Sequence, residues 1–143
     1  MKMKNVVLLF TFTLSSFSLF AQDVTQEDSL SLIFIGDIMG HDPQIQSAFN
    51  PENGEYNYEG VFRKVSHIIK AADFAIANLE VTLAGEPYAG YPQFSSPDAL
   101  ADACKKSGID VLVTANNHSC DRAKKGLLRT IHVLDSLEIP HTG

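Results

Sequence analysis

The chain has 143 residues, of which 45% are hydrophobic and 20% are charged, and this composition indicates a globular domain with a core. Its formal net charge is −6, which argues against nucleic acid as a partner because nucleic-acid-binding proteins present a basic face. The same charge offers no attraction for an anionic substrate unless bound cations reverse the local field.

Residues 1–21 have the three parts of a secretory signal peptide. Two lysines precede an apolar run from Val6 to Phe20, and Ala21 offers a cleavage point. We therefore expect an exported protein, periplasmic or at the cell surface. An uncleaved leader that keeps the protein associated with the membrane is the alternative. Residues 22–29 form a polar linker, and residues 30–143 are predicted to form the folded domain.

The first predicted strand is Leu30–Ile35, and it leads into a glycine-flanked segment that carries Asp37 and His41. Residues 43–59 contain Asn-Pro and Asn-Gly pairs, so we expect a loop long enough to form a rim or lid. A helix is predicted over residues 61–72, because apolar side chains recur there on one face. These side chains are Val61, Phe62, Val65, Ile68, Ile69 and Ala72.

A second predicted strand, Asp73–Ala77, leads into Asn78 and Glu80. Residues 81–95 are rich in Gly, Pro and Tyr, and we expect a loop that either faces a substrate or forms variable surface. The next helix is predicted to open with Ser96 and Pro97 as cap and first residue, and to stop at Gly108. Its predicted buried residues are Ala99, Leu100, Ala103 and Cys104.

The third predicted strand, residues 109–115, is followed by the polar run Asn116–Asp121. A site at the end of a parallel strand is one interpretation of this run. A polar turn capped by Asn and Asp is the other. A last helix, ended by Pro140, is predicted to turn five apolar side chains inward. They are Leu127, Leu128, Ile131, Leu134 and Leu137.

This β-α-β-α-β-α order predicts an α/β fold of parallel strands joined by crossover helices. Right-handed crossovers place the carboxyl ends of all strands at one edge of the sheet. Asp37, Glu80 and the Asn117-His118 pair are therefore expected to meet in one crevice, although they lie far apart in the sequence. This convergence is the main argument for a functional site, because each short motif alone is weak.

Carboxylates, an amide oxygen and imidazoles together favour Mn, Fe or Zn as a divalent metal cofactor over calcium, which prefers oxygen ligands alone. Two such ions bridged by a carboxylate can polarise a phosphoryl or acyl oxygen and generate hydroxide. His118 is the candidate proton donor to a leaving group, and Asp121 is the candidate that orients its ring.

Three segments, GDIMGH, ANLE and VLVTANNHSCDRAKKGLLRT, resemble the bacterial capsule-synthesis family (CapA, poly-gamma-glutamate synthesis). That family is similar to the calcineurin-like metallophosphoesterases, and the resemblance implies their layered metallophosphatase-like fold. It implies that Asp37 is the first-strand metal ligand and that Glu80 stands where those enzymes place a bridging aspartate. Asn117 and His118 resemble their asparagine ligand and catalytic histidine.

The sequence also departs from the phosphoesterase pattern. His41 is four residues after Asp37, whereas the phosphoesterases use a histidine two residues after the aspartate, where this chain has Met39. His41 is therefore a candidate metal ligand without a matching position. Both groups take further histidines from later in the chain, and beyond the last predicted helix only His141 remains here. We therefore expect an apparently truncated, amino-terminal portion of the fold that is inactive or nearly so.

Three functions follow as alternatives. The first is a metal-dependent hydrolase or transferase acting on a phosphate ester or a cell-surface polymer. The second is a non-catalytic binding component of a polymer synthesis and export assembly, whose partners would be an anionic polymer or its synthesis machinery. The third is an inactive fragment.

The two cysteines are predicted to be free thiols. Cys104 lies on the helix before the third strand and Cys120 lies beyond the far end of that strand. A strand of this length separates the two by roughly 15–20 Å, whereas a disulfide requires Cα atoms within about 7 Å.

Overall fold

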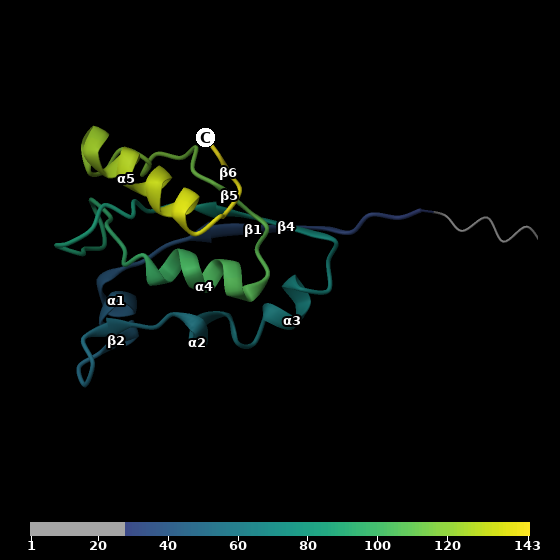
Figure 1. Cartoon of the computed structure of the whole chain (residues 1–143), viewed down its shortest axis with the longest axis horizontal. Coiled ribbons are helices and arrows are strands. Elements are labelled where there is room, and N and C mark those ends of the chain that lie inside the picture. The colour runs from purple at the N-terminus through teal and green to yellow at the C-terminus, as the bar shows by residue number, and fades with distance from the viewer. Residues whose placement is uncertain (1–27) are drawn as a thin grey trace, which may run out of the picture.

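A computed structural model describes residues 28–143, so the predicted signal peptide and most of the predicted linker lie outside the described residues. The central element is a four-stranded sheet in the order β1-β4-β5-β6, and every neighbouring pair is parallel (Figure 1). Its strands are β1 (Leu32–Ile38), β4 (Phe74–Leu79), β5 (Val111–Val113) and β6 (His141–Thr142). The predicted α/β class with parallel strands and crossover helices is confirmed.

Each connection between neighbouring strands contains helix, as the crossover rule requires. The first connection holds three helices, α1 (Asp42–Ala48), α2 (Glu59–Phe62) and α3 (Ser66–Ile69). Helix α4 (Ala99–Ser107) joins β4 to β5, and α5 (Ala123–Ser136) joins β5 to β6. Helices α2 and α3 both contact α4 (Figure 1).

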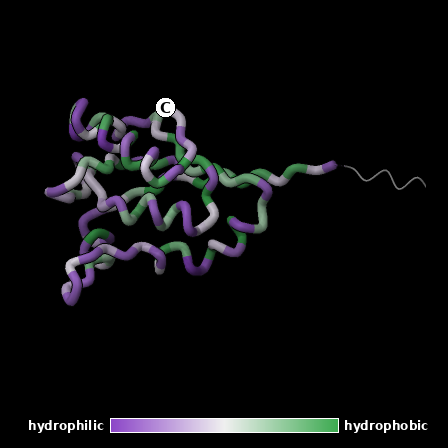
Figure 2. The backbone as a smooth tube through the Cα atoms, viewed as in Figure 1, coloured by the Kyte–Doolittle hydropathy of each residue, from purple (hydrophilic) through white to green (hydrophobic). Residues whose placement is uncertain are grey.

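The two faces of the sheet differ in burial. One face is covered and buries Ala75, Ala77 and Leu112, which are at most 1% exposed. The opposite face leaves Phe34 73% exposed and Phe74 38% exposed. Apolar residues run along the central strands, whereas the helices alternate between hydrophobic and hydrophilic residues (Figure 2).

The prediction of a loop over residues 43–59 is wrong. Helix α1 begins there because Pro43 fits a first helical turn and the Gln44 side chain accepts a hydrogen bond from the His41 backbone N–H at 2.7 Å. An antiparallel ribbon follows, made of β2 (Phe49–Asn50) and β3 (Glu55–Tyr56). The Asn-Pro and Asn-Gly pairs therefore mark only the turn of this ribbon.

The single predicted helix over residues 61–72 is also wrong. The chain forms two short helices, α2 and α3, and each buries one large side chain, Phe62 and Ile69. The break between the helices turns the rest of the predicted stripe outward, so that Val61 is 63% exposed and Ile68 is 54% exposed. Val65, which lies at the break, is 43% exposed.

The buried face of α5 differs from the predicted one because small residues make the contact. Thr130 Oγ1 donates to the Gly126 carbonyl and accepts the Leu83 backbone N–H at 2.8 Å, which docks the helix on the start of the 81–95 segment. Leu134 is fully buried as predicted, whereas Leu128 is 53% exposed.

Segment 81–95 is not a surface loop throughout. Its two ends are buried, with Leu83 and Phe94 fully enclosed, and its tip around Tyr91 is exposed. The following helix begins at Ala99 with Asp98 at the cap position, so Ser96 does not cap it. Of its predicted buried residues Ala99 is only half-buried, and the other three are buried.

Gly108 ends α4 as predicted, in the left-handed conformation with φ of 101°.

Both cysteines are free, which confirms the prediction. Burial raises the pKa of the Cys104 thiol to about 12, whereas Cys120 is exposed. Among residues 28–143 there is no helix with the length and apolar character needed to cross a membrane.

The shifted face of α5 gives a direct test of its packing. Leu134→Ala should lower the free energy of unfolding by about 2–5 kcal/mol, because a fully buried leucine leaves a cavity. Leu128→Ala removes the same atoms from an exposed position and should cost about 0.5 kcal/mol or less. Urea unfolding of both variants measures the difference, and equal losses would contradict the observed helix orientation.

Candidate functional site

Two carboxylates meet at the carboxyl ends of β1 and β4. The parallel register pairs Asp37 with Asn78, and Glu80 follows two residues later. The Asn78 side-chain amide donates to Asp37 Oδ1 at 2.8 Å and to Glu80 Oε2 at 2.9 Å. One amide group therefore holds both carboxylates, as expected if the strand ends converge.

Their proximity changes the acidity of Glu80. Burial raises the pKa of the Glu80 carboxyl, and the neighbouring Asp37 carboxyl raises it further through a shared hydrogen bond and its negative charge. His118 acts in the opposite direction and lowers the same pKa. Residues from the ends of all three predicted strands thus act on one another electrostatically.

Asn116 connects the ends of β4 and β5. Its Nδ2 donates to Asn78 Oδ1 at 3.0 Å and to the Leu79 carbonyl at 2.9 Å, while its Oδ1 accepts the His118 backbone N–H at 3.0 Å. The sequence places Asn78 and Asn116 at strand ends, but it does not predict that they connect the site residues. Asn117, the predicted metal ligand, is exposed.

His118 and Asp121 form a half-buried pair. His118 Nδ1 lies 2.8 Å from Asp121 Oδ2, and the two side chains are only 12% and 11% exposed. A carboxylate accepts hydrogen bonds, so the Nδ1 position carries the proton and Nε2 is left for a ligand. Asp121 therefore lies where it can orient the His118 ring.

Phe94 packs between two imidazoles. Its ring meets His118 edge-on at 4.7 Å between centroids and meets His41 edge-on at 5.1 Å. Its backbone N–H also donates to Asp121 Oδ2 at 2.7 Å. His41 thus lies across Phe94 from His118 and is exposed. Phe94 could not be identified from the sequence, because a phenylalanine within a loop carries no chemical signal of its own.

The carboxylate pair suits a divalent cation, but the described residues do not complete a site. Within residues 28–143, no group of three or more His, Cys, Asp or Glu side chains is arranged to hold a metal ion. The predicted ligand set of Asp37, Glu80, Asn117 and His41 is thus brought together only in part. The metal itself stays a prediction.

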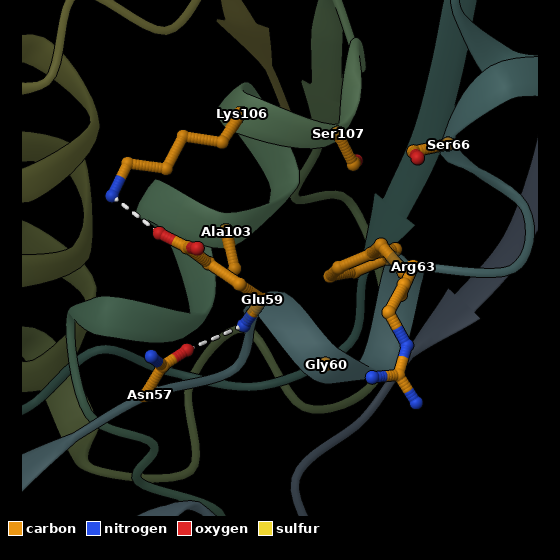
Figure 3. Close-up of a pocket in the computed structure, with 9 residues that line it drawn as sticks. Asn57, Glu59, Gly60, Arg63, Ser66, Ala103, Lys106 and Ser107 are labelled. Atoms are coloured by element: carbon orange, nitrogen blue, oxygen red, sulfur yellow. Dashed lines mark hydrogen bonds and ion pairs between the residues drawn. The ribbon is translucent and has the colours of Figure 1, made fainter.

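One hollow of the surface adjoins this cluster, and a second cavity lies away from it. A hollow of about 540 Å³, lined by residues 89–93, Asp121 and Arg122, adjoins the His118–Asp121 pair. A second cavity of about 600 Å³ lies between α2 and α4, with Arg63 and Lys106 among its lining residues (Figure 3). It shares no residue with the strand-end cluster, whereas the first hollow includes Asp121.

A parallel α/β sheet that gathers carboxylates, amides and an imidazole at its strand ends has the character of a metallophosphatase-like domain. Residues 31–143 match the model of the family described as bacterial capsule synthesis protein PGA_cap. The chain belongs to this family, whose fold is metallophosphatase-like.

Individual relatives agree with this assignment. The chain is 27% identical over 124 residues to the capsule biosynthesis protein CapA of Bacillus anthracis, an alignment that covers 82% of this chain and 29% of the relative. It is 31% identical over 91 residues to the uncharacterized proteins y4sH and y4uA of Sinorhizobium fredii, covering 57% of this chain and 20% of each relative. The chain therefore spans less than a third of the length of these relatives.

The raised pKa of Glu80 predicts a specific pH dependence. The folded protein binds a proton at Glu80 more tightly than the unfolded chain does, so stability falls as pH rises from the ordinary glutamate pKa through the raised one. Asp37→Asn removes the neighbouring charge, and its amide oxygen can still accept from Asn78. This variant should have a higher melting temperature than the wild type at pH 7 in the presence of a chelator, and the gain should shrink toward pH 4. Melting curves across this range measure the effect, and a gain that does not depend on pH would contradict the proposed cause.

The contacts of Phe94 predict that it fixes the position of both imidazoles. Phe94→Leu should shift the ring-proton resonances of His118 and His41, because the aromatic ring current at both is lost. Phe62→Leu is the matched control, since it makes the same change at another buried phenylalanine. Both variants should cost about 1–2 kcal/mol of stability. Unchanged histidine resonances in Phe94→Leu would contradict this role.

Proposed function

We propose that this capsule-synthesis domain carries metal-dependent hydrolytic chemistry, directed at a phosphate ester or an anionic cell-surface polymer. The observation that carries the proposal is the single Asn78 amide that holds the Asp37 and Glu80 carboxylates together, within the electrostatic reach of His118. Membership of a capsule-synthesis family supports a location in the cell envelope. Export through residues 1–21 is part of the proposal.

Asp37 and Glu80 are the residues proposed to hold a Mn, Fe or Zn ion, with Asn117 and His41 as further candidate ligands. Such an ion would polarise a phosphoryl or acyl oxygen and lower the pKa of a bound water. The Asn78 amide neutralises part of the repulsion between the two carboxylates and fixes their spacing.

His118 is proposed to deliver a proton to the leaving group from Nε2. Asp121 accepts the Nδ1 hydrogen bond, which fixes the ring orientation and stabilises the protonated imidazole. Phe94 donates its backbone N–H to the same Asp121 oxygen, so the carboxylate cannot turn away from the ring. The edge of Phe94 against the imidazole limits rotation from the other side.

A non-catalytic binding component of a polymer synthesis and export assembly is the second candidate. The absence of a complete metal-holding group among residues 28–143 favours it. So does the presence of Met39, a poor ligand for these metals, at the spacing where phosphoesterases place a histidine.

Metal binding by the full chain tests the proposal. Equilibrium dialysis against Mn²⁺, Fe²⁺ and Zn²⁺ should show binding that Glu80→Ala lowers by about 10-fold or more, because the anionic pair is lost. Glu52→Ala is the control, since this glutamate lies in the exposed turn of the β2–β3 ribbon.

His118→Ala separates catalysis from binding. With a phosphodiester substrate and saturating metal, this variant should keep its metal, and any slow turnover that the wild-type chain shows should fall by about 100-fold or more. Wild-type protein that binds none of the three metals would contradict the hydrolase and favour the binding component.

A further inference from the structure

We propose that the hollow formed by residues 89–93 with Arg122 is an oxyanion-binding subsite, which holds a carboxylate or phosphate group of the substrate beside the His118–Asp121 pair. The proposal rests on the proposed function only in taking the substrate to be anionic. The hollow has a volume of about 540 Å³, which is enough for a small charged group with the chain that carries it.

Arg122 supplies the positive charge of this subsite. It is half-buried, and its guanidinium lies across the backbone of the 85–95 segment, donating from Nε to the Gln93 carbonyl at 3.2 Å and from Nη2 to the Pro87 carbonyl at 3.4 Å. Both acceptors are neutral. Within residues 28–143 Arg122 forms no ion pair, so its charge is not compensated by a protein carboxylate.

The geometry of the guanidinium also leaves it able to bind a ligand. An arginine has five N–H donors in a planar fork that matches the two oxygens of a carboxylate or phosphate. The two carbonyl contacts hold the side chain in place and leave the other donors without a partner in the described part of the chain. Because these two contacts already restrict the side chain, less conformational entropy is lost when it binds a ligand.

Asp121 also lines the hollow, and one oxygen of its carboxylate is occupied by two hydrogen bonds. Its Oδ2 accepts from both His118 Nδ1 and the Phe94 backbone N–H. Tyr91, which is 72% exposed, forms the outer wall and meets Phe94 edge-on at 6.4 Å between centroids. The subsite thus combines one cation with an aromatic wall, next to the proposed proton donor, in a chain whose net charge is −6.

The cavity between α2 and α4 provides a contrast within the same molecule. It also contains an arginine, Arg63, whose side chain extends away from Lys106 (Figure 3). Lys106 is neutralised there by Glu59 at 2.8 Å and by Asp102 at 2.9 Å. Unlike Arg122, the lysine of this cavity is therefore paired with carboxylates.

The test is a binding titration of the full chain in a chelator, which makes it independent of the proposed metal. The probes are a gamma-linked glutamate oligomer, a polyphosphate of similar charge, and a neutral dextran oligomer. We expect one of the anionic probes to bind, with backbone amide shifts at Tyr91 and Arg122 in NMR spectra, and to bind more weakly as salt is added. The probe that binds tells whether the oxyanion is a carboxylate or a phosphate.

Arg122→Gln should weaken this binding by about 10-fold, whereas the matched control Arg63→Gln should leave it unchanged. Arg122→Lys keeps the charge without the fork, and its affinity should lie between those of Arg122→Gln and the wild type. Equal affinity in the wild type and both Arg122 variants would overturn the subsite, as would failure of both anionic probes to bind. Neither result would bear on metal binding by Asp37 and Glu80, which is read separately by dialysis.

Discussion

The hydrogen bonds of the Asn78 side chain hold the strand ends in their arrangement. Its amide nitrogen reaches the carboxylates of Asp37 on β1 and Glu80 after β4, and its oxygen accepts from Asn116 after β5. Parallel strands bring these groups to one edge, but topology alone does not set their spacing. A single side chain with both donors and an acceptor does so, because an amide can satisfy a carboxylate and another amide at once.

Segment 81–95 supports the side chains that lie around the Asn78 amide. One buried end of the segment is fixed to α5 through Thr130, and the other is tied to Thr82, whose hydroxyl donates to the Phe94 carbonyl. The Phe94 ring contacts both His41 and His118, and its backbone N–H donates to Asp121. Segment 81–95, which connects β4 to α4, therefore also supports His118, the candidate proton donor.

The sequence predicted the sheet better than the helices, for a physical reason. Buried parallel strands are continuous apolar runs, and their polar ends are abrupt, so Asp37, Glu80 and His118 could be located without coordinates. The helices between them depend on small contacts that hydrophobic spacing does not report. Thr130 and Gly126 set the buried face of α5, and the break before α3 turned Val65 outward.

The connecting roles of Asn78 and Asn116 and the contacts of Phe94 were not predicted, because amides and aromatic rings also have ordinary structural uses.

The arrangement of Asp37 and Glu80 is better explained by a ligand than by the needs of the fold. Two carboxylates that share one amide repel each other, and the raised pKa of Glu80 reports that the ionised form is unfavourable there. A fold that needed only to end two strands would be more stable with an amide or a hydroxyl at either position. Unfavourable charge that is held in place by neighbouring hydrogen bonds is typical of sites that bind a cation or transfer a proton. The repulsion, together with the oriented His118 on the adjacent strand end, therefore supports the proposal of a functional site at these strand ends.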